Sequence, residues 1–144
     1  MRALLFVTVL MIACSTTPKR DPHSEVFAYY LRNAFGDSIP AAKHTWILVP
    51  ENGCKGCRQS ELAMLHEELR KTSVQELEYV FSPDVPVPVT LVRPAGYRID
   101  KQGLIDKINL PVSNITIIRT ENGRIMQLHE VTADRMDSLR EYLR

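Results

Sequence analysis

The fold is decided by residues 44–57, HTWILVPENGCKGC. Residues 44–49 form an apolar, β-branched run, which is typical of a strand buried inside a sheet. Residues 50–53 (PENG) then break the strand, and a helical pattern of apolar residues follows them. Cys54 and Cys57 therefore stand where a buried strand gives way to a helix.

The patterns on both sides of this stretch predict the remaining elements. Ser24 is placed to cap a helix over residues 25–35, which Gly36 ends. Asn122-Gly123 indicates a tight hairpin turn, because both residues accept the positive φ that such a turn needs. In chain order, the other expected elements are a helix from Lys55 or Gly56 to about Lys71, a strand over 76–81, an extended piece over 85–93 that Pro86 and Pro88 push to an edge or a loop, a short helix over 100–108, hairpin strands over 115–119 and 124–131, and a helix from Thr132 to Leu143.

Residues 1–13 have the parts of an export signal that is removed from the mature protein. Arg2 gives it a positive start, residues 3–12 are mostly apolar, and Met11-Ile12-Ala13-Cys14 resembles a bacterial lipobox. Ten apolar-rich residues are too few to cross a bilayer, which takes about 20. We therefore expect a lipoprotein that is held on a membrane by an acylated Cys14. An ordinary signal peptide cut near Cys14, or an uncleaved anchor, is the alternative.

The mature chain is expected to be one domain on a tether. Residues 14–23 are polar and contain two prolines, so they predict a flexible link to a domain over residues 24–144. Removing Arg2 takes the formal charge from +1 to 0, and charges of both signs are mixed along the chain, so no nucleic-acid partner is expected. The protein should face the periplasm in the bacterial cell envelope. In the enteric sorting pattern an Asp after the lipidated cysteine favours the inner membrane, so Ser15 favours the outer one.

Lipidation of Cys14 would leave Cys54 and Cys57 as the only thiols of the folded domain. A disulfide between them closes a loop of about four residues and restrains the unfolded chain little, which favours reversible redox chemistry over a structural role. At a helix N-terminus, unpaired N–H groups and the helix dipole stabilise a thiolate. We expect Cys54 to be the nucleophile, with Lys55 adding positive charge beside it. Cys57, one turn further on and more buried, should be the resolving thiol.

The order of elements around Cys54-Lys55-Gly56-Cys57 resembles the thioredoxin fold, and in particular the TlpA/ResA-like membrane-tethered thiol-disulfide oxidoreductases of bacteria. The resemblance covers roughly residues 45–144. It implies an α/β fold, a three-layer sandwich with a central mixed sheet. It also implies that the protein exchanges disulfides with other envelope proteins through a mixed disulfide. Electrons would come from a membrane donor and no cofactor is expected, because the sequence has no flavin or nicotinamide motif.

Three positions depart from that family. Its members usually have an aromatic residue where this chain has Gly53, and many have a buried acid where it has Leu48. Glu51 is a nearby acid that would assist proton transfer, although a solvated turn is its simpler place. The family also has a cis-proline that faces the disulfide, and in this chain either Pro111 or Asn114 takes that place.

Other kinds of protein compete with a redox enzyme. A metal site needs three or four ligands, whereas the CxxC motif supplies two and the four histidines are scattered, so no metal is expected. His44 precedes the strand that leads to the two cysteines, and it is interpreted as a strand-edge or surface residue. Arg58 excludes covalent haem, which needs a histidine after the second cysteine. The remaining alternative is a non-catalytic interaction module with a static Cys54–Cys57 disulfide.

Overall fold

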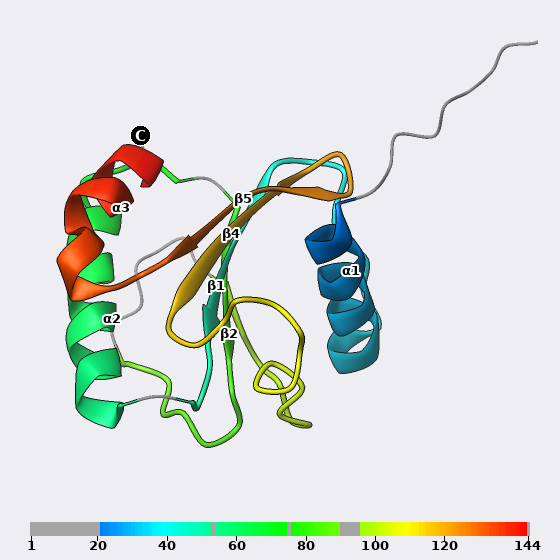
Figure 1. Ribbon diagram of the computed structural model, residues 1–144, viewed down its shortest axis with the longest axis horizontal. Helices are drawn as coiled ribbons and strands as arrows, with labels where there is room; N and C mark the ends of the chain where they lie inside the picture. The colour runs from blue at the N-terminus through cyan, green and yellow to red at the C-terminus, as the bar shows by residue number, and fades with distance from the viewer. Residues whose placement is uncertain (1–20, 53, 75, 90–95, 144) are drawn as a thin grey trace, which may run out of the picture.

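The computed structural model describes residues 21–52, 54–74, 76–89 and 96–143. They form a mixed α/β fold in which a five-stranded sheet, in the order β3-β2-β1-β4-β5, is flanked by helices (Figure 1). The strands are β1 (His44–Val49), β2 (Leu77–Phe81), β3 (Gly96–Ile99), β4 (Thr116–Glu121) and β5 (Arg124–Glu130), and the helices are α1 (Pro22–Phe35), α2 (Lys55–Leu69) and α3 (Met136–Leu143), the last preceded by a 3₁₀ turn, η1 (Ala133–Arg135). The α/β class with a central mixed sheet is confirmed.

The strand that leads to the cysteines, β1, is the middle strand of the sheet. It runs parallel to β2, where Ile47 pairs with Tyr79, and antiparallel to β4, where Ile47 pairs with Ile117. Every residue of β1 after His44 is buried. The apolar run is therefore explained by its neighbours, because strands cover both of its edges and other elements cover both of its faces.

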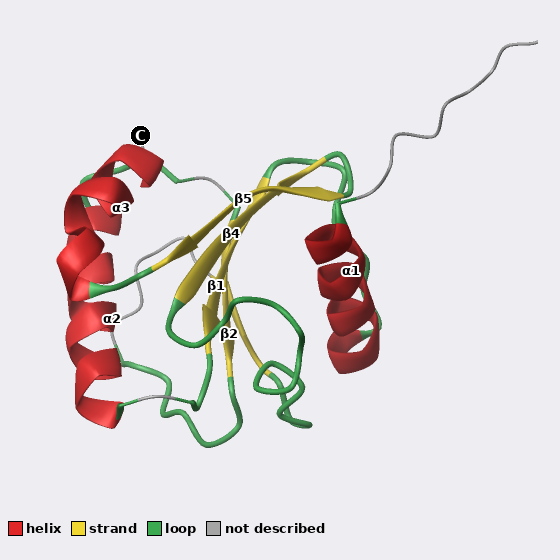
Figure 2. Cartoon of the chain, in the orientation of Figure 1, coloured by secondary structure: helices red, strands yellow, loops and turns green. Residues whose placement is uncertain are grey.

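Side chains of β1 alternate between two cores, one on each face of the sheet. Ile47 and Val49 join the core beneath α2 and α3, whereas Trp46 and Leu48 join the core beneath α1. Figure 2 shows this three-layer arrangement, with α2 and α3 on one side of the sheet and α1 on the other. The loop that precedes β4 adds Ile105 to the α1 side.

The short helix expected over residues 100–108 is wrong, because this segment is a series of turns. The side chain of Asp100, which is fully buried, accepts the backbone N–H of Gln102 at 3.2 Å and that of Ile105 at 2.7 Å. Gly103 lies between them with a φ of 59°. A side chain that binds nearby backbone N–H groups competes with helical hydrogen bonds, and here it fixes an irregular loop.

Of the two places expected for the piece over residues 85–93, an edge or a loop, the described part takes the loop. The described part of it, 85–89, contains no strand, and residues 90–93 lie outside the described residues. The edge strand is β3 instead, which pairs in parallel with β2 from Gly96 to Ile99. Pro86 and Pro88 have no N–H to offer a neighbouring strand, which accounts for the shift.

Helix α1 begins at Pro22, three residues before the expected start at residue 25. Ser24 does not cap the helix; it is buried, and its hydroxyl accepts the backbone N–H of Ile125 at 2.9 Å. The predicted end of the helix is confirmed, since Gly36 adopts a left-handed φ of 75°.

The hairpin turn is confirmed, because Asn122 and Gly123 both have positive φ, at 53° and 72°. The expected C-terminal helix is shorter at its start, since the 3₁₀ turn η1 replaces its first residues. The expected signal peptide and Cys14 lie outside the described residues, as does Gly53. Within the described ranges, no helix has the length and apolar character needed to cross a membrane.

Candidate functional site

The two cysteines lie at the start of α2, beyond the end of the central strand. Cys54 is the N-cap residue of α2, and its Sγ accepts the backbone N–H of Cys57 at 3.3 Å. Both cysteines are free thiols and both are exposed. Cys57, which was expected to be the more buried of the two, is thus itself an exposed residue. A helix N-cap is a position where a side-chain acceptor satisfies N–H groups that the helix itself leaves unpaired.

This geometry separates the acidities of the two thiols. The pKa of Cys54 is lowered from its ordinary value, first because the Cys57 thiol donates a hydrogen bond to its sulfur, and then because the backbone N–H groups of Cys57 and Gly56 do the same. The pKa of Cys57 is raised, first by that same hydrogen bond, which holds its proton. Cys54 is thus the thiol that ionises first. The expected contribution of Lys55 is not among the causes of the Cys54 shift.

Cys54 lines a small hollow that also contains one of the two residues expected opposite the thiol. Asn114 and Ile115, which directly precede β4, line this hollow together with Cys54. Asn114 Nδ2 donates to Glu130 Oε1 at 3.0 Å, which ties the asparagine to the end of β5. Pro111 is exposed on the preceding loop and does not line the hollow. Of the two expected candidates, the structure brings Asn114 to the cysteine.

A buried carboxyl group that the sequence analysis did not single out lies in the same hollow. Glu61 is 8% exposed and lines the hollow beside Cys54. Burial raises the pKa of Glu61, the charge of Glu130 raises it further, and the charge of Arg58 partly offsets both. Helical spacing was the available signal, because Glu61 follows Cys57 by four residues and so lies on the same face of α2.

Glu51, the acid expected near the motif, has a different role. Its side chain is exposed and lines a groove beside α2 rather than the hollow of Cys54. Its backbone N–H, by contrast, donates to Asp106 Oδ1 at 2.8 Å. Glu51 therefore takes part in the shape of the cysteine loop through its backbone, and Glu61 is the acid that lies close to the thiols.

Asp106 ties the cysteine loop to the irregular segment before β4. Its Oδ1 accepts the N–H groups of Glu51 at 2.8 Å and Asn52 at 3.2 Å, and its Oδ2 accepts the hydroxyl of Ser82 at 2.5 Å. On the other side, Arg58 Nη1 donates to the Pro50 carbonyl at 2.8 Å. The loop that presents Cys54 is thus fixed from two sides by charged groups.

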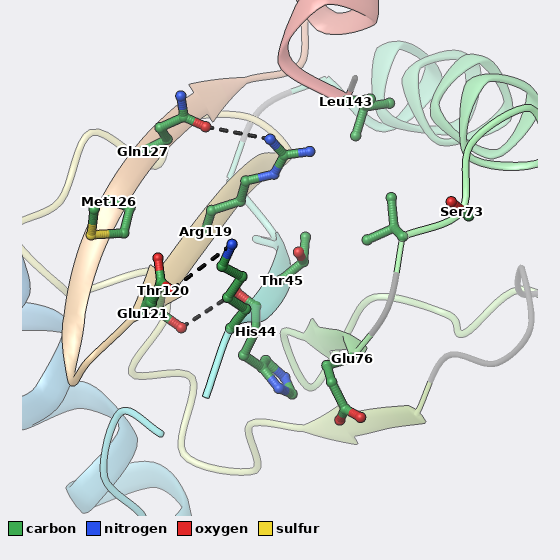
Figure 3. Close-up of a pocket in the computed structure, with 12 residues that line it drawn as sticks. His44, Thr45, Ser73, Glu76, Arg119, Thr120, Glu121, Met126, Gln127 and Leu143 are labelled. Atoms are coloured by element: carbon green, nitrogen blue, oxygen red, sulfur yellow. Dashed lines mark hydrogen bonds and ion pairs between the residues drawn. The ribbon is translucent and has the colours of Figure 1, made fainter. Parts of the chain in front are cut away.

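The far end of the sheet has its own hollow, which is separate from the cysteines. Figure 3 shows that His44, at the start of β1, lies there near Glu76 and Arg119. His44 Nε2 lies 3.5 Å from Glu78 Oε2, so the histidine pairs with a carboxylate of the neighbouring strand. Its interpretation as a strand-edge residue is confirmed. Among the described residues, no group of three or more His, Cys, Asp or Glu side chains could hold a metal ion.

Comparisons with family models, with curated proteins and with solved structures find no match for this chain. The site therefore has to be interpreted from its own geometry. It offers an exposed thiol of lowered pKa, a second thiol one helical turn away that keeps its proton, and a buried carboxyl beside them. Thiol-disulfide exchange requires a nucleophilic thiolate and a second thiol, and the two cysteines supply both.

Proposed function

We propose that the protein is a thiol-disulfide oxidoreductase with a thioredoxin-like fold. The observation that carries the proposal is the N-cap position of Cys54, whose sulfur accepts the backbone N–H of Cys57 at 3.3 Å. Together with the thiol of Cys57, this contact lowers the pKa of Cys54. A thiolate is the nucleophile in disulfide exchange, and its exposed position lets a protein disulfide reach it.

The exchange runs in two steps that move two electrons. The Cys54 thiolate attacks one sulfur of a client disulfide, which forms a mixed disulfide and releases the other client sulfur as a thiolate. Cys57 then loses its proton, and its sulfur attacks Cys54. The Cys54–Cys57 disulfide forms, the second client thiolate leaves, and the client is reduced while the protein is oxidised. Glu61, the buried carboxyl beside the thiols, is the group that would accept this proton from Cys57.

The order of elements supports the family within this proposal. A strand, a helix that begins at the CxxC motif, a parallel strand, a crossover that includes the edge strand β3, an antiparallel hairpin and a final helix follow one another in the described chain. Apart from β3, this is the order on which the resemblance to TlpA/ResA-like proteins rests. We further propose that Cys14 carries lipid and holds the domain at the periplasmic side of an envelope membrane, which the lipobox-like residues 11–14 support.

Trapping of the mixed disulfide tests the proposal. The variant Cys57→Ser should hold clients covalently on Cys54, because the thiol that resolves the intermediate is gone. The variant Cys54→Ser is the matched control, and it should trap no client because the attacking sulfur is gone. Equal trapping by both variants, or none by either, would contradict the assigned roles.

A second candidate is the interaction module with a static disulfide. Two observations favour it, namely Asn114 at the position opposite Cys54 and Leu48 at the position of the relay acid. In that case, the Cys54–Cys57 bond would resist reduction and neither serine variant would trap a partner. The lowered pKa of Cys54 favours the enzyme.

A further inference from the structure

The loop that lies opposite Cys54 has no proline at the hollow to fix its backbone. Residues 112–115 read Val-Ser-Asn-Ile, while Pro111 is exposed and does not line the hollow. A proline ring restricts φ to one narrow range, whereas serine and asparagine leave it free. Their side chains also bind nearby backbone groups, which lets such a loop adopt several turn conformations. The position of Asn114 therefore depends on its contacts with the rest of the fold.

One carboxylate oxygen at the end of β5 binds two consecutive residues of this loop. Glu130 Oε1 accepts the Ser113 hydroxyl at 2.5 Å and Asn114 Nδ2 at 3.0 Å. The register explains this reach, because Glu130 pairs with Thr116 and Asn114 is its diagonal neighbour across the hairpin. Hydrogen bonds to an ionised carboxylate are shorter and roughly twice as strong as those between neutral groups. A single charge thus ties the loop to the sheet.

Two other contacts hold the backbone of the same loop. The Val131 N–H donates to the Ile115 carbonyl at 2.7 Å, and the Thr116 hydroxyl donates to the Asn114 carbonyl at 3.0 Å. These contacts extend the hairpin as far as Ile115 and hold the carbonyl of Asn114. The direction of the Asn114 side chain is set by its bond to Glu130.

Glu130 also acts on the buried carboxyl beside the thiols. Glu61 is 8% exposed and lines the same hollow as Cys54 and Asn114. Burial is the main cause that raises the pKa of Glu61, and the charge of Glu130 raises it further. A change that removes the charge of Glu130 should therefore be visible in the titration of Glu61.

We propose that Glu130 is a positioning residue for thiol exchange, which holds the loop of Ser113 and Asn114 opposite Cys54 where this chain lacks a proline. The proposal rests on the thiol exchange proposed above. Glu130 does not line the hollow itself, so it acts through Asn114 rather than on the client. Reacting sulfurs have to meet within a narrow range of distance and angle, so a displaced loop would slow the attack on the client disulfide.

Two matched variants separate the position of the loop from the charge of Glu130. The assay is the second-order rate constant with which the reduced protein reduces a peptide that contains one disulfide bond. Glu130→Ala removes both hydrogen bonds, so this rate constant should fall about tenfold. Glu130→Gln keeps an oxygen that accepts both bonds, so it should stay within about twofold of the wild type. An unchanged rate constant in Glu130→Ala, or equal losses in the two variants, would overturn the proposal.

A double-mutant cycle shows whether Glu130 acts through Asn114. Asn114→Ala removes the partner of the carboxylate. Adding Glu130→Ala to Asn114→Ala should therefore slow the reaction much less than Glu130→Ala slows the wild type. Losses that simply multiply would show that the two residues act independently, and would overturn the proposal.

The titration of the Glu61 carboxyl group, followed by carbon NMR, gives a result that does not depend on exchange. The pKa of Glu61 should be lower in both Glu130→Ala and Glu130→Gln than in the wild type, because both changes remove the charge. An unchanged pKa of Glu61 in both variants would overturn the placement of Glu130 beside the site. A wild-type protein that does not reduce the peptide would instead overturn the exchange reaction itself, on which the proposal rests.

Discussion

Replacing Asp106 by alanine should destabilise the protein and disturb the reactive thiol together. Asp106 lies on the irregular loop before β4, yet its carboxylate holds the backbone N–H groups of Glu51 and Asn52 at 2.8 and 3.2 Å. It also accepts the hydroxyl of Ser82 at 2.5 Å. The Asp106→Ala change removes all three contacts and leaves the backbone of the cysteine loop without its anchor.

The free energy of unfolding should fall by about 2–4 kcal/mol. The two backbone contacts lie near solvent, so water replaces the carboxylate there at a net cost of about 0.5–1.5 kcal/mol for each bond. Ser82 is fully buried, so its hydroxyl is left without a partner, at a cost of about 1–3 kcal/mol. The three bonds share one carboxylate and are not additive, which places the total below their sum.

Urea unfolding measures the stability, and the pH dependence of alkylation measures the acidity of Cys54. We expect the pKa of Cys54 to rise in Asp106→Ala, because a loosened loop no longer holds the sulfur at the N-cap of α2. Asp106→Asn is the matched control. Its amide oxygen still accepts both backbone N–H groups, so it should lose less than half as much stability. Equal losses in the two variants, or an unchanged alkylation profile in Asp106→Ala, would refute the reasoning.

Three further changes probe the site and its supports. The charge of Glu61 raises the pKa of both thiols, so Glu61→Gln should lower both pKa values. Alkylation measured against pH checks this, and a raised or unchanged pKa would contradict it. The hydrogen bond from Lys71 and the charge of Arg140 lower the pKa of Glu68. Glu68 therefore stabilises the fold above its unfolded pKa, and this stability is lost as the pH falls through the folded pKa. In Glu68→Gln, the stability should depend less on pH below about pH 4.5, and an unchanged pH dependence there would contradict the pairing. Leu65 is a fully buried residue of α2, so Leu65→Ala should lower the free energy of unfolding by about 2–5 kcal/mol in urea; a loss below about 1 kcal/mol would show that this core is loosely packed.

The elements that the sequence predicted well are those whose signal is local. The apolar run of β1 is buried because it is the central strand, and α2 begins at Lys55 as its pattern indicated. The turn at Asn122-Gly123 follows from the backbone freedom of these two residues. In each case, a short stretch of chain contains the whole physical reason for its structure.

The parts that the sequence did not predict depend on contacts between distant residues. Asp106 lies 55 residues from Glu51, and nothing in either stretch indicates that a carboxylate of one would bind the backbone of the other. Asp100 replaces an expected helix by a loop through its own side-chain contacts. The choice between Pro111 and Asn114 likewise depended on how that loop packs, and the structure brings Asn114 to the thiol.

The central claim is that Cys54 and Cys57 form a redox-active pair, and their reduction potential tests it most directly. The protein is equilibrated with glutathione or dithiothreitol buffers, and the free thiols are then counted by alkylation. A reversible potential between about −270 and −120 mV is the result we predict, because enzymes of thiol-disulfide exchange lie in that range. A potential below about −300 mV, or thiols that never exchange with the buffer, would contradict the account and show a structural disulfide.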